Sequence, residues 1–307
     1  MYDQVTSNKR RSWLLIGGFV TFVALVAVVF AYLIGGGPLG FVIALVVAGV
    51  TSGLAYWKSD AVALRISRAQ PAPVEQYARY HNIVEGLCIA SGLPKPRLYV
   101  VDDPAPNAFA TGRDPRNAAV AVTTGLLEKM NRIELEGVIA HELSHIKNYD
   151  ILVSTLAVTM VGIVAVLADI GVRMTWWGMG RRSHRDFDSR HGGHGGPAAL
   201  LSIAGFVLLA LSPLIARAMQ RAVSRRREIL ADMSGVEMTR YPPGLISALE
   251  KLRDDSTVVH STSHATAHLW IEQPAARTEA EGRMSRLNRM FDTHPPLEER
   301  IALLREL

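Results

Sequence analysis

The chain has 307 residues, of which 49% are hydrophobic and 20% are charged, and its mean hydropathy is +0.17. This composition is too apolar for an ordinary soluble domain, so we expect part of the chain to contact lipid. The net charge of +5 does not indicate nucleic-acid binding, because many basic residues flank apolar runs, where anionic headgroups attract them. The single cysteine, Cys88, excludes an internal disulfide framework.

The first two elements are apolar runs at residues 13–34 and 39–57, which contain no charged side chain. Each has about the ~20 residues that a helix needs to cross a ~30 Å hydrocarbon core. A cleaved signal peptide is the alternative for the first run, but its apolar stretch exceeds the usual ~7–15 residues. Basic residues lie outside both ends, at positions 9–11 and at 58, 65 and 68. The positive-inside rule then predicts a membrane hairpin with both flanks in the cytoplasm.

Residues 58–150 are expected to form a first soluble segment. Helical spacing near residues 74–91 ends at Gly92, and the alternating run 97–101 predicts a strand. A second short strand fits residues 118–123. Helical spacing resumes after this strand and continues through residues 132–148.

The helix predicted over residues 132–148 carries His141-Glu-Leu-Ser-His145, which has the HExxH pattern. Two histidines four residues apart on one helical face can direct their ring nitrogens at one Zn²⁺. Glu142 lies next along the turn, where it can act as the general base for the water that attacks a peptide bond. The alternative is a pair of surface histidines on a helix.

A second pair of apolar runs lies at residues 151–168 and 198–216. Two spans would return the chain to the side that it left, so residues near His141 can share one aqueous face with those after 216. The intervening residues 173–196 are rich in arginine, and these positive charges conflict with the positive-inside rule. A shallow re-entrant pair is therefore the alternative to two full spans.

Three histidines also lie in the stretch 173–196, at positions 184, 191 and 194. We interpret this stretch as a solvated loop, and a second metal site is the alternative.

The basic helical stretch that follows contains Glu228-Ile-Leu-Ala-Asp232, with two carboxylates on one helical face. A catalytic zinc site needs a third protein ligand and keeps a fourth position for water, so Glu228 is predicted to be that ligand. Asp232 is predicted to hydrogen-bond a ligand imidazole. An ion pair between Glu228 and the arginines at 225–227 is the alternative.

Asp150 follows His145 closely and is a further candidate for hydrogen-bonding a ligand imidazole. A residue at the membrane boundary is the alternative for Asp150. The remainder, residues 241–307, alternates short helical pieces with polar stretches.

Taken in order, these motifs resemble the HtpX-type membrane metalloproteases. The resemblance rests on the HExxH and ExxxD patterns, on Pro106-Asn-Ala-Phe-Ala-Thr-Gly112 and on Thr293-His-Pro-Pro296. It implies a gluzincin catalytic domain on the cytoplasmic face and a role in quality control of membrane proteins. Residues 268–274 also look typical of the family, without a role that the sequence supplies. The related CAAX prenyl endoproteases share the zinc motifs but have more spans.

The resemblance also implies where substrate binds. An extended peptide would add as a strand beside the segments 107–112 and 118–123, for which an ordinary hairpin is the alternative. His294 would face the cleft and stabilise the oxyanion, or act as a structural cap. The residues expected to contact substrate are Asn107, Ala108, Phe109, Ala110, Ala119 and Ala121.

We therefore expect a mainly α protein with a small β-sheet, about four transmembrane helices and a cytoplasmic zincin-like catalytic domain. Residues 1–57 would form a transmembrane hairpin, and residues 151–218 a second transmembrane or re-entrant pair. The catalytic domain would be divided between residues 58–150 and 219–307.

The expected function is that of a multi-pass zinc endopeptidase of the inner (plasma) membrane, with one Zn²⁺ per chain. Its partners would be unfolded or membrane protein substrates and the lipid bilayer, with no nucleic acid. Two alternatives are a membrane-anchored scaffold with a non-catalytic zinc site and a prenyl-protein protease. A purely structural zinc site would have no need of the Glu142 carboxylate.

Overall fold

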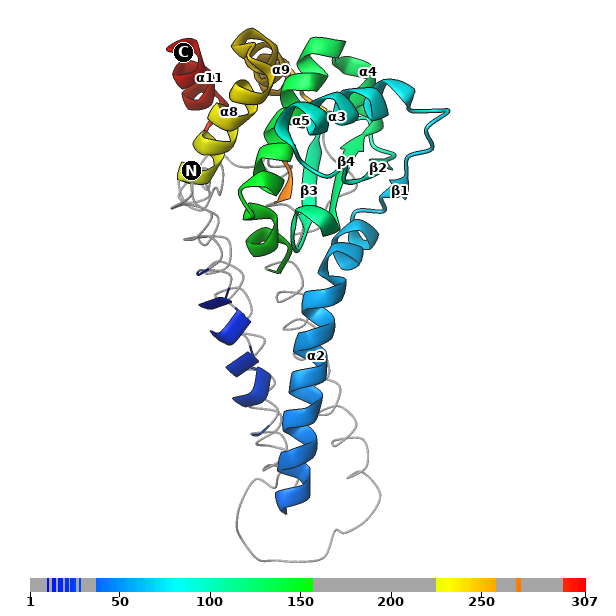
Figure 1. Ribbon diagram of the computed structural model, residues 1–307, viewed down its shortest axis with the longest axis vertical. Coiled ribbons are helices and arrows are strands. Elements are labelled where there is room, and N and C mark those ends of the chain that lie inside the picture. Colours follow the sequence, from blue (N-terminus) through cyan, green and yellow to red (C-terminus); the bar gives the residue numbers. More distant parts are fainter. Residues whose placement is uncertain are drawn as a thin grey trace, which may run out of the picture.

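The computed structural model describes residues 37–156, 225–257, 269–271 and 295–307, together with scattered helical residues between positions 10 and 28. Helix α2 projects from a globular part in which the other elements gather (Figure 1). In chain order the elements are α2 (Gly37–Ile66), β1 (Gln70–Pro71), α3 (Ala78–Ser91), β2 (Arg97–Val101), β3 (Ala108–Gly112), η1 (Pro115–Asn117), β4 (Ala118–Thr123), α4 (Thr124–Lys129), α5 (Arg132–Lys147), α8 (Arg225–Thr239), α9 (Pro242–Asp254) and α11 (Leu297–Arg305).

The sheet is mixed, with the strand order β1-β2-β4-β3. Strand β4 is parallel to β2 and antiparallel to β3, so β3 lies at an edge. The turn between β3 and β4 depends on Gly112, whose φ is +140. An added Cβ there would lie 2.4 Å from the carbonyl oxygen of Asn117, so only glycine fits in this turn.

Helix α5 lies at the centre of the globular part, packed against α8, α9 and β3. Its start is fixed by a capping box, in which the Asn131 side chain accepts from the Glu134 backbone and the Glu134 side chain accepts from the Asn131 backbone. The alternation of β4 separates two apolar clusters, one on each face of the sheet. Val120 and Val122 join the cluster that includes α5, whereas Ala121 joins the smaller one at the end of α2.

The fold class expected from sequence is confirmed in its coarse form, a mainly helical protein with a small mixed sheet. The strands over 97–101 and 118–123 are confirmed. The helix predicted near 74–91 is found at Ala78–Ser91, so it begins later than predicted and ends, as predicted, at Gly92, where φ is +70. Strand β1 has only two residues, too few for a hydrophobic alternation to reveal it.

The predicted membrane runs are only partly covered by the described residues. The run 39–57 lies within α2, and the first residues of the run 151–168 are helical up to residue 156. Among the helices in the described part of the chain, none is both long enough and apolar enough to cross a membrane. The run 198–216 and the stretch 173–196 lie outside the described residues.

Candidate metal centre

The HExxH residues lie in the buried part of α5. His141 is fully buried, Glu142 is 2% exposed, and the side chain of His145 is 15% exposed. One helical turn separates the two imidazoles, and their Nε2 atoms are 3.2 Å apart. The rings are nearly perpendicular, at 88°. Two ring nitrogens therefore face a common point beside the helix.

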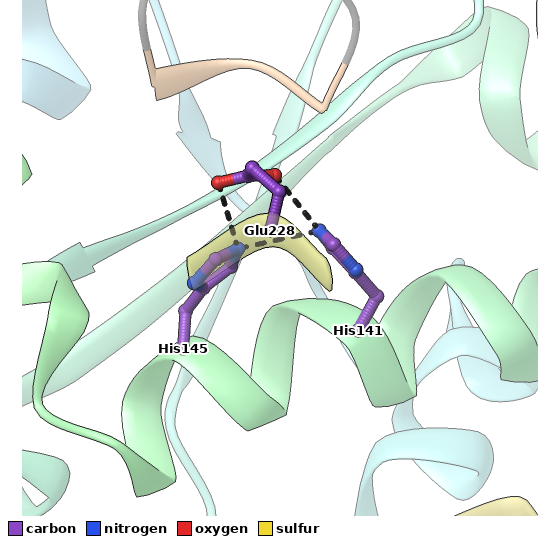
Figure 2. A group of neighbouring side chains, drawn as sticks. All are labelled: His141, His145 and Glu228. Carbon is purple, nitrogen blue, oxygen red and sulfur yellow. Dashed lines mark hydrogen bonds and ion pairs between the residues drawn. The ribbon is translucent and has the colours of Figure 1, made fainter. Parts of the chain in front are cut away.

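The third donor comes from α8. The two carboxylate oxygens of Glu228 each lie 3.6 Å from an Nε2 atom, one from that of His141 and the other from that of His145 (Figure 2). Gly235 allows the close approach of α8 to α5, because a Cβ at this position would lie 3.0 Å from the backbone nitrogen of His141. The packing of the two helices thus determines where the Glu228 carboxylate lies.

The separations of these three donors fit zinc. Ligands placed tetrahedrally at about 2.0–2.1 Å from a metal are about 3.3 Å from one another. The observed separations are 3.2 Å between the two nitrogens and 3.6 Å from each nitrogen to a carboxylate oxygen. Two imidazoles and one carboxylate also form a donor set typical of catalytic zinc sites, which keep one position for water.

Asp232 and Arg300 hold the far side of the His141 ring. Asp232 Oδ1 lies 2.8 Å from His141 Nδ1. Arg300 donates from Nε and Nη2 to the two oxygens of Asp232, at 2.8 and 2.6 Å. Because Nδ1 is held by the carboxylate, the Nε2 lone pair of His141 is directed at the metal position. The structure thus brings Asp232 to the place that the sequence predicts for it.

Asp150 holds the second imidazole less closely. Its Oδ2 atom lies 3.3 Å from His145 Nδ1, and its Oδ1 atom lies 3.8 Å from Nη1 of Arg227. Tyr149 supports this arrangement by adopting a φ of +60, which turns the chain at the end of α5. Both carboxylates predicted to orient the histidines therefore lie beside their Nδ1 atoms.

The charges around the two imidazoles favour a cation. Burial lowers the pKa of His141, but Asp232 and Glu228 outweigh burial and raise it to about 9. Burial likewise lowers the pKa of His145, and Glu228 and Asp150 bring it above the ordinary value. For Asp232, burial raises the pKa, yet Arg300 and His141 bring it down to about 2. A proton or a metal ion is therefore stabilised at this position.

The β3 edge lies beside α5, and part of it is covered by residues 269–271, which we call the strap (Figure 1). The Ile271 N–H donates to the carbonyl oxygen of Ala108 at 3.0 Å. Trp270, which is fully buried, packs edge-on against Phe109, with ring centroids 4.7 Å apart. Asn107, just before β3, is buried and accepts from the backbone of Ala108.

The expectation that Ala119 and Ala121 contact an added substrate strand needs correction. Both residues lie on β4, which is paired with β2 on one side and with β3 on the other. Their side chains are fully buried in the cluster at the end of α2. Of the two edge strands in the described part of the sheet, β1 and β3, only β3 packs beside α5. His294 lies outside the described residues.

Sequence reasoning missed Arg300 and Arg227 as parts of the site. Arg300 did leave a signal, because it lies within the apolar spacing of Leu297, Ile301 and Leu304, where a charge is unexpected. Arg227 left none, since it belongs to a run of three arginines.

Comparison with known proteins gives a consistent result. The model of the family described as Peptidase family M48 matches residues 75–307. A Protease HtpX homolog of Thermoanaerobacter pseudethanolicus is 41% identical over 307 residues, covering 100% of this chain and 98% of that protein. A Protease HtpX homolog of Streptococcus uberis is 40% identical over 308 residues, covering 100% of both.

Among solved structures, the crystal structure of S. mikatae Ste24p is similar in fold. It covers 99% of this chain and 67% of its own, with a TM-score of 0.50 and 16% sequence identity.

Proposed function

The chain belongs to peptidase family M48 and is a metallopeptidase, and on that premise we propose that it is a zinc endopeptidase that cleaves unfolded or damaged proteins at a membrane. The observation that carries the proposal is the convergence of His141, His145 and Glu228 from α5 and α8, at separations that fit zinc. Glu142 adds a carboxylate that a purely structural metal site would not need.

The chemistry is divided among these residues. When bound, zinc supplies a Lewis acid that makes water nucleophilic near pH 7 and polarises the carbonyl of the scissile bond. Glu142 accepts the proton of the attacking water and returns it to the leaving amine. Asp232 and Asp150 orient the two histidines by holding their Nδ1 atoms.

The substrate pairs with the outer edge of β3. Backbone groups alternate along an edge strand, so those of Ala108 and Ala110 point away from β4. The carbonyl of Ala108 accepts from Ile271, and the N–H of Gly112 donates to Thr155. Ala110 lies between these two contacts, and we propose that its N–H and C=O bind an extended peptide.

His294 is proposed to stabilise the oxyanion that forms when the water attacks. The support comes from α11, which begins three residues later and brings Arg300 to within 3.3 Å of His141. The first turn of α11 therefore lies close to the metal centre.

We further propose a multi-pass protein of the inner membrane with the metal centre in the cytoplasm. Residues 58–150 and 219–307 would together form the catalytic domain, between and after the paired segments 1–57 and 151–218. The support is the four apolar runs of the sequence and the exposed apolar side chains along α2, among them Leu39, Val42 and Leu54.

The experiment is hydrolysis of casein by the detergent-purified chain, with zinc measured in the same preparation. We expect cleavage that a chelator abolishes and zinc restores. Glu142→Gln should keep its zinc and lose about 10²–10⁴-fold in rate, because only the general base is removed. Full activity of Glu142→Gln would contradict the role of Glu142. Stoichiometric zinc in the wild type without hydrolysis of any unfolded protein would contradict the proposed function, as would cleavage restricted to farnesylated peptides.

A further inference from the structure

Arg300 occupies an unusual position for an arginine. Its side chain is 0% exposed, and a charge so deeply buried requires close partners. Two of its donors are taken by Asp232, at 2.8 and 2.6 Å. A third donor, Nη1, points to the carbonyl oxygen of Ile271 at 3.4 Å. One guanidinium therefore contacts both the carboxylate that orients His141 and the backbone of the strap.

Ile271 is held at both of its backbone groups. Its N–H donates to Ala108 on the edge strand, and its C=O accepts from Arg300. Trp270 adds an apolar contact with Phe109 of the same strand. The strap is thus fixed to β3 on one side and, on the other, to Arg300, which holds Asp232 beside His141. A chain of contacts runs from His141 through Asp232, Arg300 and Ile271 to Ala108.

We propose that Arg300 is a positioning residue that organises the metal centre and the substrate edge together. Through Asp232 it fixes the imidazole of His141, and through Ile271 it holds the strap at the Ala108 end of the edge on which a peptide pairs. The second half of this inference rests on the proposed function, because it assumes that substrate binds along β3.

The geometry needs a guanidinium. Arginine presents several N–H groups in a fixed planar fork, so it can donate twice to one carboxylate and once more to a carbonyl. A lysine ammonium keeps the positive charge beside Asp232, but it is a single point on a flexible stem and cannot replace the fork. Arg300→Lys should therefore keep the positive charge beside Asp232 and lose the hydrogen bond to Ile271.

The test uses the full-length, detergent-purified chain with Arg300→Gln, Arg300→Lys and the control Arg305→Gln. Arg305 lies on the same helix and forms an exposed ion pair with Glu250, so the control alters α11 without reaching the site. Three quantities are measured: the zinc Kd by chelator competition, hydrogen exchange of the Ile271 amide, and the KM and kcat for a peptide.

For Arg300→Gln we expect a zinc Kd about 10–100-fold higher, as for the loss of other residues that support metal ligands, and faster exchange at Ile271. Arg300→Lys should recover most of the zinc affinity, while exchange at Ile271 stays fast and KM is raised more than kcat is lowered. Arg305→Gln should match the wild type in all three measurements.

Two results would overturn the inference. In one, Arg300→Lys restores the slow exchange at Ile271 together with zinc affinity, so that charge alone suffices. In the other, both substitutions of Arg300 lower thermal stability but leave the zinc Kd and the Ile271 exchange of the folded protein unchanged, as expected of a packing residue. Zinc affinity and exchange need no hydrolysis, so they decide the role of Arg300 even if the chain cleaves no protein.

Discussion

The two histidines of the metal centre are supported unequally. His141 is fully buried, and Asp232 lies 2.8 Å from its Nδ1 atom and is itself held twice by Arg300. His145 is partly exposed, and Asp150 lies 3.3 Å from its Nδ1 atom. Arg227 lies beside Asp150, with its Nη1 atom 3.8 Å from Oδ1 of Asp150. One half of the site is therefore tightly held and the other is held more loosely.

The difference follows from where the supporting residues lie in the chain. Asp232 and Arg300 come from α8 and α11. Helix α8 packs against α5, and α11 packs against α8 and α9, so tertiary packing fixes the distances of both residues to His141. Asp150 follows α5 directly, and a local turn at Tyr149 brings it back to His145. A support built from three packed helices is rigid. We therefore expect the residues that hold His141 to contribute more to zinc affinity and to stability than those that hold His145. The following changes test this comparison.

The largest effect is expected for Asp232→Asn. This change removes the negative charge that faces a fully buried guanidinium and that orients His141. We expect a loss of about 3–5 kcal/mol in the free energy of unfolding and a zinc Kd about 10–100-fold higher. Asp150→Asn is the matched control and should change both quantities less. Chemical denaturation and chelator competition measure them, and equal losses in the two variants would remove the distinction between the halves.

The pH dependence of zinc affinity tests the contribution of Asp232 to the His141 side of the site. Zinc binds neutral imidazole, and the pKa of His141 in the metal-free chain is about 9. Zinc affinity should therefore rise with pH, by up to about tenfold per unit, until pH 9. Asp232→Asn should flatten this rise because Asp232 raises the pKa of His141.

The stability of the metal-free fold should depend on pH in the opposite direction. A raised pKa means that protonated His141 stabilises the fold fully below its unfolded pKa of about 6.5, and that this contribution is lost as pH rises through 9. Metal-free stability should fall over this window. Thermal unfolding after chelation measures it, and a rise in stability between pH 7 and 9 would contradict the charge arrangement around His141.

A smaller effect is expected at the contact between α5 and α8. In Gly235→Ala the new methyl group would lie 3.0 Å from the backbone nitrogen of His141, so α8 must shift together with Glu228 and Asp232. Overpacking of this kind lowers stability by about 1–3 kcal/mol. Zinc affinity should fall as well, because the shift moves a ligand.

Two glycines provide controls for Gly235→Ala. Gly137→Ala crowds the backbone of Leu245 at 2.8 Å, on α9, so it should lower stability with little change in zinc affinity per folded molecule. Gly86→Ala meets no atom within 4 Å and should be stabilising by about 0.5–1 kcal/mol, because alanine favours helix. Equal zinc losses in Gly137→Ala and Gly235→Ala would show that the helix contact has no specific role.

The sequence predicted the parts of the site that local patterns encode. Helical spacing and the HExxH motif identified α5, and a spacing of four residues put Glu228 and Asp232 on one face of α8. The strap and the role of Arg300 escaped because they depend on contacts between residues 29 or more apart in sequence, which no periodicity records. Ala119 and Ala121 were assigned to the substrate edge because the order of strands cannot be read from the strands themselves.

Helices α5 and α8 together are expected to hold one metal ion. The decisive measurement is the zinc content of Glu228→Ala beside the wild type, after dialysis, because Glu228 is the one ligand that lies outside the HExxH motif. We expect one zinc per chain in the wild type and loss of zinc from a Glu228→Ala protein that remains folded. One tightly bound zinc per chain in Glu228→Ala would show that α8 does not supply a ligand.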